Sequence, residues 1–147
     1  MKISSVALAF VAAVAIGSHF LGLTTTQAVA GVPVAKQSPF FCDQAALTPA
    51  VRKRHFDVLG PALIAKRMNV RELPDGYEFQ LPSDATTYQE AAEYIGAERL
   101  CCPFFEISLR LTPEGGPLWI RFTGRPGTKE FIAGDGADWI SPVSVHR

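Results

Sequence analysis

The stretch Val70–Leu81, VRELPDGYEFQL, decides the fold because it holds two strand patterns around one turn. From Tyr77 to Leu81 apolar and polar residues alternate, as a strand with one buried face requires. The tripeptide Pro74-Asp75-Gly76 supplies residue types that tight turns prefer. The stretch therefore predicts a β-hairpin with strands over Val70–Leu73 and Tyr77–Leu81.

A second hairpin pattern follows later in the chain. Residues 105–111, FEISLRL, alternate between apolar and polar side chains. Thr112–Pro117, with two glycines, separates them from a fourth strand at residues 118–122, LWIRF. The inward set of the last strand is Leu118, Ile120 and Phe122.

Helical patterns surround the two hairpins. Thr48-Pro49 can start a first helix, which Gly60-Pro61 should kink or restart. Ser83 or Asp84 can cap a second helix that ends at Cys101 or Cys102, before Pro103, and a short helix should include Lys129 to Ala133. The order α-β-β-α-β-β-α predicts an α+β fold, with helices packed on one face of a four-stranded antiparallel sheet.

The N-terminus has the pattern of an export signal. Residues 1–30 combine a basic start at Lys2, an apolar run and the site Ala28-Val29-Ala30, which predicts a cleaved signal peptide and a periplasmic or secreted protein. The alternative is an uncleaved anchor over Val6–Leu23. After cleavage, no membrane association is expected.

The remaining chain divides into three expected parts. Residues 31–41 carry two prolines and predict an extended linker, residues 42–135 a single domain, and residues 136–147 a C-terminal tail. The chain has 147 residues, of which 48% are hydrophobic and 19% charged, as in one compact domain. A net charge of +0 argues against a nucleic-acid partner, which would require a basic excess.

The adjacent pair Cys101-Cys102 is the most conspicuous chemical feature. Counting helix phase from Tyr88 at about 100° per residue places Arg99 and Cys102 on the stripe that faces the core. The same count leaves Cys101 on the flank with Glu98, so Cys101 is expected to be the accessible thiol, with Glu98 and Arg99 as supporting residues. Simple packing of buried cysteines is the alternative.

Two oxidation states are open for the three cysteines. A bond between neighbours would be strained, because adjacent Cα atoms lie about 3.8 Å apart and ordinary disulfides need roughly 4.4 to 6.8 Å. A bridge from Cys42 to Cys101 or Cys102 is slightly preferred over three free thiols in an oxidising compartment.

The same three sulfurs are candidate ligands for a soft metal ion. Cys42, Cys101 and Cys102 could provide three thiolates, with His55 or Glu98 as further donors, although their spacing matches no structural zinc motif. For His55, which lies on the apolar stripe of the first helix, packing with one hydrogen bond is the simpler expectation.

Three motifs carry a resemblance to other proteins. They are RELPDGY at 71–77, ERLCCPFF at 98–105 and TGRPGTKEF at 123–131. Together they resemble a group of small uncharacterised bacterial proteins with an E-R-x-C-C-P-F-F signature, over roughly Ala46 to Ile132. The resemblance implies no particular activity, and similar double-cysteine segments suggest thiol chemistry or heavy-metal response by association.

Two functions follow from these patterns. The first is thiol-based binding or sensing of a soft metal or of redox state; the second is a structural or partner-binding module whose cysteines serve packing and a disulfide. No motif brings together the base, nucleophile and oxyanion site of a catalytic centre, so an enzyme is not expected.

Overall fold

The computed structural model describes residues 36–142. The predicted signal peptide, the alternative anchor and residues 31–35 of the predicted linker lie outside these residues. Among the described helices, none has both the length and the hydropathy that a membrane span requires.

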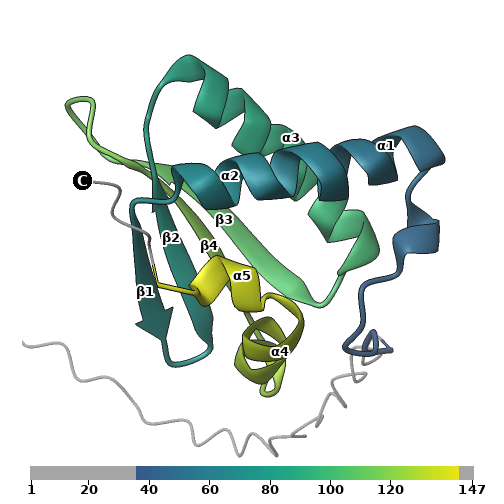
Figure 1. Cartoon of the computed structure of the whole chain (residues 1–147). Helices are drawn as coiled ribbons and strands as arrows, with labels where there is room; N and C mark the ends of the chain where they lie inside the picture. Colours follow the sequence, from purple (N-terminus) through teal and green to yellow (C-terminus); the bar gives the residue numbers. More distant parts are fainter. Residues whose placement is uncertain (1–35, 143–147) are drawn as a thin grey trace, which may run out of the picture. The chain divides into compact units, whose positions relative to one another are not determined.

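The sheet has the predicted antiparallel form (Figure 1). Its strands are β1 (Asn69–Leu73), β2 (Gly76–Leu81), β3 (Phe105–Leu111) and β4 (Leu118–Gly124), in the spatial order β1-β2-β4-β3. The two hairpins join through β2 and β4, where Phe79 lies opposite Ile120. Gly76 lets β2 lie close to the backbone of β4, because a Cβ at residue 76 would lie 2.0 Å from the carbonyl oxygen of Phe122.

The helices cover one face of this sheet, as predicted. Figure 1 shows α1 (Pro49–Arg54), α2 (Gly60–Lys66) and α3 (Ala85–Cys101) across that face, with α4 (Thr128–Asp135) and α5 (Ala137–Ile140) beside them. A short 3₁₀ turn, η1 (Gln44–Ala46), precedes α1. The α+β prediction and its approximate element order are therefore confirmed.

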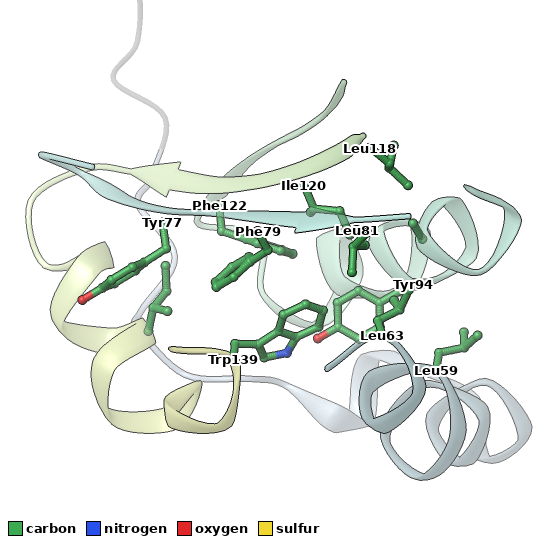
Figure 2. Packing of buried hydrophobic residues seen from close by; sticks show 12 residues of the cluster. Leu59, Leu63, Tyr77, Phe79, Leu81, Tyr94, Leu118, Ile120, Phe122 and Trp139 are labelled. Carbon is green, nitrogen blue, oxygen red and sulfur yellow. The ribbon is translucent and has the colours of Figure 1, made fainter. Parts of the chain in front are cut away.

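The main core lies between the sheet and these helices (Figure 2). The alternating residues of β2 and β4 form its sheet side, as their pattern predicts: Tyr77, Phe79, Leu81, Leu118, Ile120 and Phe122. Burial of such side chains contributes about 1.5–3 kcal/mol for each large one.

Two helix starts also follow the sequence. The Thr48 hydroxyl accepts a hydrogen bond from the Val51 amide at 3.4 Å, and the Asp84 carboxylate accepts one from the Thr87 amide at 3.0 Å. Each contact satisfies an amide that has no partner within its own helix.

The expected kink at Gly60-Pro61 takes the form of a π-helical turn, η2 (His55–Leu59), between α1 and α2. A proline inside a helix has no N–H to donate, and its ring clashes with the carbonyl four residues earlier. The wider turn relieves this clash at Asp57 while keeping the helix continuous, with the Gly60 amide bonded to the carbonyl of His55.

The C-terminal end differs from its prediction. Residues 136–142 are not a tail, because α5 places Trp139 in the core, with its ring 5.0 Å from Phe79 and 5.4 Å from Tyr94. Arg67 holds this end by donating to the carbonyls of Asp138, Trp139 and Ser141. The burial of this large aromatic side chain extends the core beyond residue 135.

The N-terminal boundary also moves. Phe40, assigned to the linker, packs edge-on against Phe104 at 5.1 Å, so the packed domain begins before Cys42.

The face of the sheet away from the helices carries a charged group, which we call the arginine cluster: Glu78 with Arg71, Arg110 and Arg121. The Glu78 carboxylate, 1% exposed, accepts hydrogen bonds from Arg71 and Arg110 at 2.9 Å each, and Arg121 lies 3.8 Å away. Burial alone would raise the pKa of Glu78, but the arginines outweigh it and hold the pKa below its ordinary value.

Candidate functional site: a thiol cluster at the end of helix α3

Three sulfur atoms meet at the C-terminal end of α3. The Sγ atoms of Cys42, Cys101 and Cys102, which we call the thiol cluster, all lie within 4.8 Å of one another. The pair comes from the end of α3 and Cys42 from the loop before η1. The amide of Asp43 donates to the carbonyl of Cys101 at 2.8 Å, which fixes the loop beside the helix end.

The three cysteines are free thiols. Cys42 lies beside the pair, as predicted, but the disulfide bridge that the sequence slightly favoured is not formed. The structure corresponds to the second alternative, three reduced sulfurs.

The expected difference in access between Cys101 and Cys102 is wrong. Their exposed fractions are 0% and 2%, so both are buried. Cys102 is no longer helical, with φ −124° and ψ 64°, and this turn directs it inward although it follows Cys101 directly. Neighbours on a regular helix would point about 100° apart.

The phase of α3 explains the rest of this error. Its buried face contains small and polar residues: Thr87, Ala91, Tyr94, Ala97, Glu98 and Cys101. Tyr88, the reference for the predicted stripe, is 42% exposed. Arg99 is consequently exposed and makes no contact with the thiols in the described structure, whereas Glu98 is buried beside them. Of the two supporting residues, only Glu98 belongs to the site.

Apolar side chains, most of them aromatic, surround the thiol cluster. Leu47, Ala97 and Phe104 are buried with Cys101 and Cys102, and Phe40, Phe56, Phe105 and Phe131 pack around them. This apolar surrounding makes an isolated charge costly, so any thiolate here needs a partner.

His55 is the titratable side chain that lies beside Cys101. It comes from the first residue of η2, is 1% exposed, and stacks on Tyr94 with the ring centres 4.3 Å apart. Its Nε2–H donates to the Glu98 carboxylate at 2.8 Å, the one hydrogen bond that the sequence led us to expect. Nδ1 has no hydrogen-bond partner within residues 36–142. Ligand atoms of His55, Glu98 and Cys101 also lie within 4.8 Å of one another.

These contacts separate the pKa values of the thiols. Hydrogen bonding by Cys102 is the largest influence on Cys101; burial opposes it, His55 adds to it, and the pKa of Cys101 falls to about 5. The contact with Cys101 and burial both raise the pKa of Cys102. Burial raises the pKa of Cys42 to about 12. Of the three thiols, Cys101 is therefore the one whose pKa is lowered.

The pKa of His55 is also shifted. Burial lowers its pKa, but contact with Cys101 and Glu98 outweighs burial and raises it to about 9. His55 thus lies close to both Cys101 and Glu98, and each of these contacts favours its protonated form.

A cavity of about 250 Å³ adjoins the thiol cluster. Cys42 and Cys102 form part of its wall, as do His55 and Glu98, and half of the remaining lining residues are aromatic. Cys101 is not among the lining residues. We call this space the aromatic cavity.

No family model, curated protein or solved structure matches the chain. The grouping by the E-R-x-C-C-P-F-F signature stays a prediction. The fold and the site together define an α+β protein with a cluster of three thiols, two buried and one half-buried. Two donor sets share Cys101: three sulfurs, or one sulfur with an imidazole and a carboxylate.

Sequence reasoning named every donor of these two sets, but not their arrangement. It did not reveal the aromatic cavity, whose walls come from elements far apart in the chain. The one sequence feature that bears on the arrangement of the site is the proline after Gly60, because it causes the π-helical turn that begins at His55.

Proposed function

We propose that the protein binds a soft, thiophilic metal ion through Cys42, Cys101 and Cys102. The observation that carries this proposal is the separation of the three sulfurs, at most 4.8 Å. Two sulfurs on one ion, each at about 2.3 Å from it, lie no more than about 4.6 Å apart. Small side-chain rotations therefore suffice to form the site.

The chemistry of the donors selects the class of ion. Thiolates favour copper(I) and similar soft ions over magnesium or calcium, which prefer oxygen ligands. Binding would release the protons of Cys42 and Cys102, whose raised pKa values keep them protonated in the free protein. The ion's charge then replaces those protons in stabilising the buried sulfurs. We place this function in the periplasm or outside the cell, in keeping with the N-terminal pattern of the sequence.

Copper(I) titration under anaerobic conditions tests the proposal. The reduced full-length protein should take one copper(I) per chain from a competing chelator, and Cys42→Ser, Cys101→Ser and Cys102→Ser should each weaken binding by at least roughly tenfold. Arg99→Gln is the matched control, because Arg99 adjoins the same helix end but is exposed. Equal binding by a triple serine variant would overturn the proposal.

The packing of the thiols also favours a second candidate, a structural module. The Asp43 amide and the residues around Leu47 hold Cys42 beside the pair. In a structural module, the sulfurs would do no more than join this loop to α3. A thiol count on protein isolated without reductant separates the two. One titratable thiol supports a structural bridge, and three support a reduced binding cluster.

A further inference from the structure

We propose that the ligand is a soft-metal cation carrying one small aryl group, with the metal on the thiol cluster and the aryl group in the aromatic cavity. This inference rests on the proposed function and adds the class of ligand. Cys42 and Cys102 belong to the wall of the cavity, so a metal bonded to either sulfur lies beside the space. A bare ion would leave the space beside it empty.

The volume fits such a group. An apolar cavity of about 150 Å³ in a protein interior is sufficient to bind benzene. The aromatic cavity has about 250 Å³, which leaves room for a phenyl ring and the metal attached to it.

The walls suit an aryl ring as well. Phe105, Phe122, Phe131 and Trp139 all line the cavity, with Phe105 and Phe122 at 5.3 Å in an edge-to-face arrangement. Aromatic rings attract one another in this geometry beyond the effect of buried area. A methyl group would make fewer of these contacts.

Charge favours a cation over an anion. Three carboxylates line the cavity, of which Glu98 is buried and Asp135 and Asp138 are exposed. His55 is the one basic residue of the lining, and its hydrogen bond to Glu98 already offsets one of these charges. The remaining acidic groups should attract a cation and repel an oxyanion.

The binding step is an exchange of a proton for the metal. With R–M⁺ for the aryl-metal cation, a metal–sulfur bond forms as the S–H bond of Cys102 breaks, giving R–M–S–Cys102 and a proton that leaves to solvent. The carbon–metal bond stays intact and no group is oxidised or reduced.

Phenylmercury(II) and methylmercury(II) are the probes, each exchanged between the reduced full-length protein and a small monothiol. We expect the protein to prefer phenylmercury over methylmercury by at least roughly tenfold, relative to the monothiol, because only the phenyl ring fills the cavity. Cys102→Ser should remove this preference.

A cavity-filling variant tests where the ring binds. Ile64→Phe places a larger, flat side chain in the wall of the aromatic cavity and should reduce the phenyl preference while methylmercury binding stays unchanged. Ile95→Phe is the matched control, because Ile95 packs against the same core but does not line the cavity. If Ile64→Phe does not fold, 4-biphenylylmercury(II) serves as the test on the wild-type protein. The protein should not prefer this longer aryl group over methylmercury as it prefers phenylmercury.

The two proposals fail in different ways. Equal exchange constants for phenyl- and methylmercury, with copper(I) still bound through the cysteines, would overturn the aryl inference alone. An unchanged phenyl preference in Ile64→Phe would overturn it too. Loss of all cysteine-dependent metal binding would overturn the proposed function and this inference together.

Discussion

Two buried carboxylates, one on each face of the sheet, have very different neighbours. Glu78 is 1% exposed and lies among three arginines, whose charge is permanent. Glu98 is 7% exposed and lies beside His55 and the thiol cluster, all of which can gain or lose protons.

The charges that surround Glu78 are fixed, whereas those that surround Glu98 can change. The arginine cluster neutralises Glu78 at any pH near neutrality, so its contacts serve the fold. At Glu98 the neighbouring charges depend on protons that a metal ion can replace. Substitutions at the two carboxylates should therefore affect different properties, stability at Glu78 and binding at Glu98.

The largest effect is expected from reversing the charge of Glu78. Glu78→Lys places a fourth cation in a buried position among three arginines, and should cost more than about 4 kcal/mol of unfolding free energy, or prevent folding. Urea denaturation followed by circular dichroism measures the loss. Glu106→Lys, on an exposed site of β3, is the control and should change stability by less than about 0.5 kcal/mol. A similar stability in both variants would contradict the role assigned to the arginine cluster.

The next effect concerns metal binding. Glu98→Gln removes the carboxylate that orients His55, and should weaken copper(I) binding by roughly 10- to 100-fold, as loss of groups that support metal ligands commonly does. Glu78→Gln should leave copper(I) affinity unchanged, since it lies on the opposite face of the sheet. The chelator competition described above measures both. An equal loss in the two variants would erase the distinction between the carboxylates.

Dependence of stability on pH gives a smaller effect at Glu78. Its pKa is lowered on folding, so its contribution is complete above the ordinary value of 4.5 and is lost as the pH falls toward the lower folded value. The difference in urea midpoint between wild type and Glu78→Gln should therefore be constant above about pH 5.5 and shrink in more acidic solution. A difference that grows on acidification would show the opposite sign of shift.

Within the arginine cluster the smallest effect is expected at its most distant member. Arg121 lies 3.8 Å from the Glu78 carboxylate and is 46% exposed, so Arg121→Gln should cost less than about 0.5 kcal/mol. Arg110→Gln, which breaks a 2.9 Å contact, should cost more in the same urea experiment. The reverse order would mean that distance to Glu78 does not set these contributions.

The fold was predictable because strand periodicity is strong in this chain. Alternation over residues 77–81 and 118–122 identified the inward side chains of β2 and β4, and the turn residues set the hairpins. Helix α3 gave a weaker signal, since its buried face holds Thr87, Ala97 and Glu98 rather than large apolar residues. A stripe drawn through Tyr88 and Arg99 therefore chose the wrong face.

The site was predictable in its members more than in its geometry. Three cysteines, His55 and Glu98 could be named from residue type alone, because few other side chains bind soft metals. Their burial could not, because it depends on the turn at Cys102 and on aromatic residues from distant segments. Trp139 was missed for the same reason: its partners Phe79 and Tyr94 lie far from it in sequence.

The contact between Arg67 and helix α5 has a consequence for the order of events during synthesis. Arg67 emerges from the ribosome long before the carbonyls of Asp138, Trp139 and Ser141 that it binds. Until residues 138–141 are translated, its guanidinium lacks its partners and the core lacks the indole ring. The domain can therefore complete its packing only after these residues have left the ribosome, so that a nascent chain stalled before residue 138 should remain sensitive to protease.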